Sequence, residues 1–130
     1  MDRLFVYGTL MRGFDHPMAK LLAANADFLG DATCRGKLYL VRHYPGLVLS
    51  DNTGDIVYGE LFRLRARDEL LREIDMYEAC GEGFNQPTEY VREMLRVSLA
   101  DGSASEAWTY VYNWPIAKLP RIASGRFIEN

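Results

Sequence analysis

Residues 4–10 read LFVYGTL, and this short stretch constrains the fold more than any other part of the sequence. Residues 4–7 are apolar or aromatic and suit a β-strand, and Gly8 ends the run. We therefore expect a buried strand that leads into a tight turn. A glycine lets a ligand approach the backbone, and successive free N–H groups in a turn can hold a carboxylate or an oxyanion. The alternative is an ordinary glycine at the end of a strand.

Outward from this turn, the pattern predicts several more strands and two helices. We expect β-structure at residues 28–41, 47–49, 56–64, 90–99 and 106–112, and helices at residues 17–26 and 67–77. Turn residues at 50–54 and 100–103 separate neighbouring strands, and residues 79–88 form a loop. The residues after 114 read as an irregular tail. The sequence thus predicts a mostly antiparallel barrel or curled sheet with helices packed on it.

The composition favours an ordinary globular protein with no nucleic-acid partner. A chain of 130 residues fits a single domain spanning 1–130, and 48% hydrophobic residues suffice for a core. The net charge of −3 disfavours nucleic acid, which binds a basic face. No segment is long and apolar enough to cross a bilayer, and the first residues lack the features of a secretory signal. We expect a cytoplasmic protein with no membrane partner.

The cysteines and histidines predict no metal site. Cys34 and Cys80 lie far apart with no CxxC pair, and His16 and His43 are isolated. A site built from His43, Cys34 and a carboxylate is the one arrangement left open. The turn at Gly8 resembles neither a Walker loop nor the GxGxxG fingerprint, so we expect no nucleotide cofactor.

One carboxylate shares the apolar face of the second expected helix, whose last residues read LLREIDMYE (70–78). At about 100° per residue the apolar stripe consists of Leu70, Leu71, Ile74 and Tyr77. Glu78 falls in the middle of that stripe. Burial and the helix dipole at its C-terminal end both raise the pKa of Glu78 toward the range useful for proton transfer. Alternatively the helix ends at Met76 and Glu78 points into water. Glu82, in the following loop, is a second candidate acid.

Aromatic residues recur on the expected strands, where they pack well. Tyr110 and Tyr112 are two residues apart on one strand, so both point to the same face. Tyr44 precedes a Pro-Gly turn signal. Most of these side chains should pack in the core or at its rim, and a few can line a pocket and offer hydroxyl groups to a ligand.

Several motifs together resemble the gamma-glutamylcyclotransferase-like family. They occupy residues 5–10 with 12–13, 44–47, 57–61, 74–78 followed by 90–92, 107–112, and 124–125. Their order and spacing along nearly the whole chain make the resemblance specific. One segment departs from the pattern, because residues 78–90 are longer than in compact members. That loop can reshape the mouth of a pocket or act as a lid.

The resemblance implies an α+β fold, a mostly antiparallel β-barrel of about six strands flanked by two or more short helices. It implies an enzyme that acts on a small gamma-glutamyl substrate, cyclising the gamma-glutamyl group to pyroglutamate with release of the amine. Glu78 would be the catalytic acid/base, and no cofactor is needed. Substrate would be bound by Tyr7, Gly8, Thr9 and Leu10 through backbone N–H groups, and by Tyr44, Tyr110 and Tyr112.

Two other classes of function remain open at this stage. A small-molecule binding module would keep the barrel and the pocket without turnover. A structural or interaction protein would have no sizeable pocket next to Glu78. No exposed apolar helix stands out, so we expect a monomer or a weak homodimer.

Overall fold

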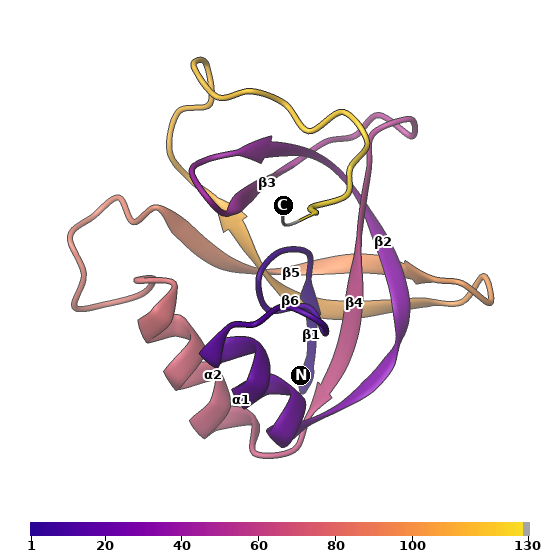
Figure 1. Ribbon diagram of the computed structural model, residues 1–130, viewed down its shortest axis with the longest axis vertical. Coiled ribbons are helices and arrows are strands. Elements are labelled where there is room, and N and C mark those ends of the chain that lie inside the picture. The colour runs from indigo at the N-terminus through magenta and orange to yellow at the C-terminus, as the bar shows by residue number, and fades with distance from the viewer. Residues whose placement is uncertain (129–130) are drawn as a thin grey trace.

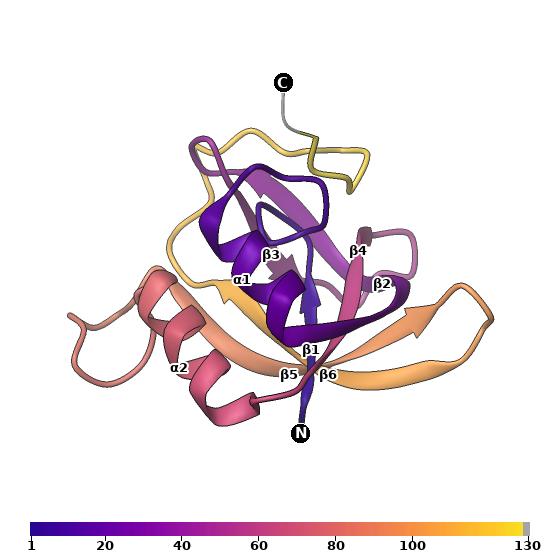
Figure 2. The same cartoon turned by 60° about the horizontal axis from the view of Figure 1, so that its bottom comes forward.

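The computed structural model describes residues 1–128, which form six strands and two helices (Figure 1). In chain order the elements are β1 (Arg3–Val6), α1 (Pro17–Asn25), β2 (Ala26–Leu40), β3 (Pro45–Leu49), β4 (Ile56–Leu64), α2 (Arg67–Tyr77), β5 (Tyr90–Leu99) and β6 (Ala104–Tyr112). The two helices lie side by side on one flank of the sheet (Figures 1 and 2). Within residues 1–128, no helix is long and apolar enough to cross a bilayer.

Five of the strands close into a ring. The sheet has the order β1-β4-β2-β3-β6-β5, and an additional pairing of β6 with β1 completes the barrel. The pairs β1–β6 and β3–β6 are parallel, and the other pairs are antiparallel. β5 stands outside the ring, paired along the length of β6 and briefly with β2. The expected mostly antiparallel barrel of about six strands is therefore confirmed, with the sixth strand attached to the ring.

Side-chain hydrogen bonds strengthen the short contact that closes the barrel between β1 and β6. The buried Thr109 hydroxyl donates to the Phe5 carbonyl oxygen at 2.7 Å. The buried Tyr7 hydroxyl donates to the Tyr110 carbonyl oxygen at 2.6 Å and accepts from the Leu47 N–H at 3.2 Å. One tyrosine side chain thus connects the end of β1 to both β6 and β3.

The apolar run at residues 4–7 is buried on both of its faces. Phe5 and Tyr7 point into the barrel, where they join a core cluster with residues of the other strands. Leu4 and Val6 point the other way and pack in a second cluster that includes Ile74 of α2. A short strand covered on both sides accounts for the continuous apolar sequence, as predicted.

Most element boundaries follow the sequence, and the differences come from strand pairing. α1 begins after His16, which is the N-cap because its Nδ1 accepts the Met18 N–H at 3.1 Å. β2 starts directly at the end of α1, two residues earlier than expected. β3 starts at residue 45, where a turn was expected, because residues 45 and 46 pair with residues 40 and 39 of β2.

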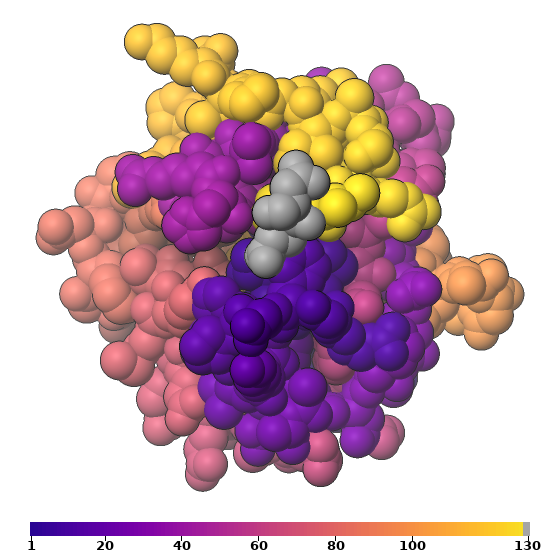
Figure 3. Space-filling view, viewed as in Figure 1, coloured from indigo at the N-terminus to yellow at the C-terminus, as the bar shows by residue number. Residues whose placement is uncertain are grey.

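The C-terminal segment after β6 is irregular, as expected, yet it packs against one end of the barrel (Figure 3). The Ile122 N–H donates to the Leu38 carbonyl oxygen at 2.7 Å, which attaches the segment to β2. Farther on, the Phe127 ring stacks on Phe14, with ring centroids 5.7 Å apart. Phe127 also belongs to the core cluster inside the barrel.

The barrel leaves no room for a side chain at Gly59 of β4. A Cβ atom there would collide with the Val6 carbonyl oxygen and lie 2.7 Å from the Phe5 ring. We predict that Gly59→Ala lowers the free energy of unfolding by about 3 kcal/mol, since an overpacked core must shift backbone as well as side chains. Urea denaturation measures the loss. Gly54→Ala is the control, because the nearest atom there is 3.4 Å away on the flexible Asn52 side chain. Equal stability of Gly59→Ala and Gly54→Ala would contradict the packing described.

Candidate active site

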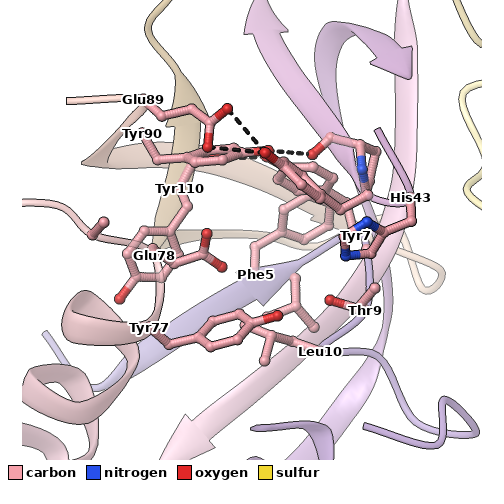
Figure 4. Close-up of a pocket in the computed structure, with 15 residues that line it drawn as sticks. Phe5, Tyr7, Thr9, Leu10, His43, Tyr77, Glu78, Glu89, Tyr90 and Tyr110 are labelled. Carbon is pink, nitrogen blue, oxygen red and sulfur yellow. Dashed lines mark hydrogen bonds between the residues drawn. The ribbon is translucent and has the colours of Figure 1, made fainter. Parts of the chain in front are cut away.

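A pocket of about 240 Å³ opens where five segments of the chain meet. Its wall is formed by residues 5–10, 43–45 and 77–79, by residues 89–90, and by Tyr110. These residues come from the bend after β1, the start of β3, the C-terminal end of α2, and the adjoining ends of β5 and β6. Figure 4 shows their side chains around the common space. The pocket lies next to Glu78. A structural or interaction protein was expected to have no sizeable pocket there, so this fold disfavours that class of function.

Glu78 is the C-cap residue of α2, and its side chain points into the pocket (Figure 4). Its N–H donates to the Ile74 carbonyl oxygen at 2.9 Å, so the helix continues through Tyr77. The alternative in which the helix ends earlier and Glu78 faces water is therefore wrong. Three residues of the expected stripe are buried, namely Leu70, Leu71 and Ile74. Tyr77 is the exception, because it lies at the pocket rim and is 44% exposed.

The carboxylate of Glu78 is held in an environment that disfavours its charge. Burial raises the pKa of Glu78 to about 7, and the negative charges of Glu89 and Asp75 add to the effect. Among residues 1–128, no arginine, lysine or histidine forms a salt bridge with Glu78. The raised pKa expected from the sequence is present, and two neighbouring carboxylates that sequence reasoning missed contribute to it. A carboxyl group with this pKa can both accept and donate a proton near neutral pH.

The bend at residues 7–10 forms the opposite part of the wall. Gly8 lies against Pro45, and a Cβ atom on Gly8 would be only 2.9 Å from the proline Cγ. Among the backbone hydrogen bonds of the part of the chain described, none has the N–H of Gly8, Thr9 or Leu10 as its donor. Binding of an anion by these three N–H groups stays a prediction from the sequence.

The segment after the bend is fixed by Glu60, a buried residue of β4. The Arg12 N–H donates to Glu60 Oε1 at 2.7 Å, and Arg12 Nε donates to Glu60 Oε2 at 3.2 Å. The Arg12 guanidinium also lies 3.4 Å from the centroid of the Phe28 ring. Both residues fall in motifs noted in the sequence, but no role was predicted for either. Their contact arises because β1 pairs with β4, with Val6 opposite Glu60.

Tyr44 and Glu89 form a second polar group on the pocket wall. The Tyr44 hydroxyl lies 3.0 Å from each carboxylate oxygen of Glu89 and donates to that group. Burial, followed by the bond to Glu89, raises the pKa of Tyr44 to about 12. The neighbouring Tyr90 donates to the Pro45 carbonyl oxygen at 2.6 Å. Tyr44 was predicted to contact substrate, whereas Glu89 and Tyr90 were not singled out.

Tyr110 and Tyr112 share a face of β6 and are both buried, yet they differ in position. Tyr110 lines the pocket, and its hydroxyl donates to Asp75 Oδ1 at 2.6 Å. Tyr112 lies outside the wall and packs edge-on against Tyr90, with ring centroids 5.4 Å apart. Tyr112 therefore supports the wall from behind rather than facing the pocket.

Asp75 anchors the C-terminal end of α2 on the sheet. Besides the Tyr110 hydroxyl, it accepts from Arg92 Nε at 2.9 Å and from Arg92 Nη2 at 3.1 Å. Arg92 in turn lies over the Trp108 ring, 4.4 Å from its centroid. Because Asp75 is one helical turn before Glu78, these bonds fix the position of the acidic side chain. The sequence placed Asp75 off the apolar stripe and gave no sign of this role.

Tyr77 is positioned from the other helix. Its hydroxyl lies 2.8 Å from His16 Nε2, and the two rings meet edge-on. His16 Nδ1 already accepts the Met18 N–H, so in the neutral ring the proton sits on Nε2 and is donated to the Tyr77 oxygen. The Tyr77 hydroxyl lies close to Thr9 at the bend (Figure 4).

The long loop between α2 and β5 contributes its two ends to the pocket. Ala79 and Glu89 belong to the wall, whereas the middle of the loop, with Glu82, lines a separate surface hollow. Glu82, the second candidate acid, is thus outside the site.

Cys34 and Cys80 are both unpaired thiols and lie in different core clusters. Among residues 1–128, no three His, Cys, Asp or Glu side chains gather as they would around a metal ion.

Comparison with known proteins relates almost the whole chain to one family. A family model described as "Gamma-glutamyl cyclotransferase, AIG2-like" matches residues 4–129. The gamma-glutamylcyclotransferase family protein YtfP of Escherichia coli is 33% identical over 130 residues, covering 98% of this chain and 96% of that protein. Gamma-glutamylaminecyclotransferase of Homo sapiens is 31% identical over 117 residues, covering 82% of this chain and 69% of that protein.

Solved structures agree with the sequence matches. An AIG2-like protein of Mus musculus has a TM-score of 0.76 and 26% identity, covering 98% of this chain and 88% of that chain. The solution structure of ytfP from Escherichia coli has a TM-score of 0.64 and 32% identity, covering 98% of this chain and 96% of that chain.

The pKa of Glu78 makes stability depend on pH. The folded protein holds this proton up to about pH 7, whereas the ordinary value of 4.5 means that the unfolded chain releases it earlier. Between these values the native state binds more protons, so the contribution of Glu78 to stability is lost as pH rises. Glu78→Gln should remove this loss. We predict that the change in the free energy of unfolding caused by Glu78→Gln is more favourable at about pH 8 than at about pH 5, by roughly 2 kcal/mol.

Urea denaturation of both proteins at the two pH values measures this difference. Glu82→Gln is the matched control, because it removes an exposed carboxylate outside the pocket and should change stability little at either pH. A Glu78→Gln effect that is the same at both pH values would show that the carboxylate titrates as it does in water.

Proposed function

Since the chain belongs to the gamma-glutamylcyclotransferase family, we propose that it is an enzyme that cyclises a gamma-glutamyl group to pyroglutamate. The substrate is a small gamma-glutamyl amine or peptide, and the second product is the free amine. The observation that carries this proposal is the desolvated carboxylate of Glu78, which forms no salt bridge within residues 1–128 and lies in a pocket whose wall includes the bend at residues 7–10.

The reaction is an intramolecular acyl transfer. The nitrogen of the substrate α-amine attacks the γ-carbonyl carbon, a new C–N bond closes the five-membered ring, and the original amide C–N bond breaks. Glu78 as carboxylate removes a proton from the attacking α-amino group and then gives it to the leaving nitrogen, so the group returns to its starting state. A pKa of about 7 suits both steps, because neither proton transfer is strongly uphill. Folding the substrate back on itself supplies most of the remaining assistance.

The bend supplies the electrostatic part of the mechanism. The N–H groups of Gly8, Thr9 and Leu10 donate to the substrate α-carboxylate or to the oxyanion that develops on the γ-carbonyl. Glu60 and Arg12 hold the segment that follows the bend, so these donors are in place before substrate arrives. No cofactor takes part in this scheme.

Aromatic side chains shape the rest of the site. The rings of Tyr7, Tyr44 and Tyr110 line the pocket and exclude water from the reacting atoms. The Tyr7 hydroxyl is occupied within the barrel, so this residue contributes its ring and its backbone. Tyr112 acts indirectly, by supporting Tyr90. The name of the human relative, gamma-glutamylaminecyclotransferase, supports an amine as leaving group.

We predict that Glu78→Gln abolishes pyroglutamate release and still binds gamma-glutamyl compounds. Loss of a general acid/base lowers kcat by about a hundredfold to ten-thousandfold, whereas the isosteric amide keeps the shape of the pocket. Turnover is measured by chromatography of pyroglutamate from a panel of gamma-glutamyl amines, and binding by thermal shift. Glu82→Gln should match the unchanged protein. An active Glu78→Gln protein would reject Glu78 as the acid/base.

The pH profile gives an independent check. Activity requires ionised Glu78, so kcat/KM should rise with pH and level off above an apparent pKa of about 7. A profile set by an unshifted carboxyl group would already be flat at that pH. Binding of gamma-glutamyl compounds by the unchanged protein, with no pyroglutamate formed at any pH, would favour the binding module instead.

A further inference from the structure

Among residues 1–128, the pocket wall includes two carboxylates and no guanidinium or ammonium group. Glu78 and Glu89 both line it, and none of its lining residues is arginine or lysine. The salt bridges formed within residues 1–128 include neither glutamate. His43 is at the exposed rim, and Arg42, the next residue along the chain, lies near Tyr44 without belonging to the wall. The proposed reaction uses Glu78 and assigns no role to the carboxylate of Glu89.

The side chain of Glu89 is held in place by a neighbouring tyrosine on the pocket wall. The Tyr44 hydroxyl bonds to its carboxylate oxygens, and the adjoining Tyr90 side chain is fixed by its bond to Pro45. The rings of Tyr44 and Tyr90 lie 6.2 Å apart, so two aromatic side chains lie near this carboxylate. A carboxylate beside aromatic rings is the environment that attracts an alkylammonium group, by charge and by cation–π interaction.

The geometry points to Glu89 as a specificity-determining residue that binds a second, protonated amine on the leaving group. On this inference, which rests on the proposed function, the preferred substrate is a gamma-glutamyl diamine or polyamine. The bend binds the α-carboxylate of the gamma-glutamyl group, and Glu78 transfers the proton at the amide bond that breaks. Glu89 binds the distal ammonium group of the leaving amine. A leaving group that ends in a carboxylate is repelled by the same charge.

Three conjugates of nearly equal length test this directly. L-gamma-glutamyl conjugates of 1,5-diaminopentane, hexylamine and 6-aminohexanoate end in a cation, a methyl group and an anion. We predict that kcat/KM for the diamine conjugate exceeds that for the hexylamine conjugate by about tenfold and that the anionic conjugate is poorest, with the preference shrinking as salt rises.

Variants of Glu89 test whether this residue causes the preference for the diamine conjugate. Glu89→Gln keeps an acceptor for the Tyr44 hydroxyl and should abolish the preference for the diamine, whereas Glu89→Lys should reverse it in favour of the anionic conjugate. Removing the Glu89 charge also lowers the pKa of Glu78, but this alters all three reactions alike, so the ratio between substrates is unaffected. Glu82→Gln, which removes the same charge from the same loop outside the pocket, should retain the preference.

The outcomes separate this inference from the function on which it rests. Equal kcat/KM values for the three conjugates would overturn the role of Glu89 while leaving the cyclisation intact. If Glu89→Gln lowered kcat/KM for all three conjugates by the same factor, the role of Glu89 would also be overturned. Glu89 would then act on the gamma-glutamyl group that the three conjugates share. Failure of the unchanged protein to release pyroglutamate from any conjugate would reject the proposed function, and the inference with it.

Discussion

The hydroxyl of Tyr7 connects three strands of the barrel, and the position of the pocket depends on that connection. β1 has only four residues, yet it pairs with both β4 and β6 and so closes the ring. The bonds from Tyr7 to Tyr110 and Leu47 reinforce this closure from inside the core. Because the bend starts at the next residue, the interactions that close the barrel also fix the N–H groups of the bend.

The second constraint is the carboxylate of Glu78, which is half-buried and forms no salt bridge within residues 1–128. Such a group costs stability at high pH, and the structure holds it in place with contacts one turn earlier on the helix. Asp75 accepts hydrogen bonds from Arg92 and Tyr110, which attach the end of α2 to β5 and β6. The carboxylate of Asp75 thus anchors the end of the helix that carries Glu78.

The polar groups of the pocket are separated by type. Backbone donors lie on the bend after β1, and carboxylates lie at the end of α2 and the start of β5. A wall of this kind complements a ligand that is anionic at one end and cationic at the other, because each end meets the opposite charge. Glu89 occupies the part of the wall contributed by the long loop, the segment in which the sequence departs most from the compact pattern.

The sequence by itself determined the features that depend on neighbouring residues. The strand and bend at residues 4–10 and the hairpin turn at residues 100–103 follow from turn chemistry, which is local. Helical periodicity placed Glu78 on the apolar stripe of its helix, but the structure was needed to show that the helix continues to this residue. Only the tertiary structure decided which distant residues meet. Glu60 reaches Arg12 across 48 residues and Tyr44 reaches Glu89 across 45. Strand register and barrel closure set these contacts, and they also place Tyr112 behind the wall although it shares a face with Tyr110. A periodic pattern identifies the face of a strand, but the curvature of a closed sheet decides which residues on that face reach the cavity.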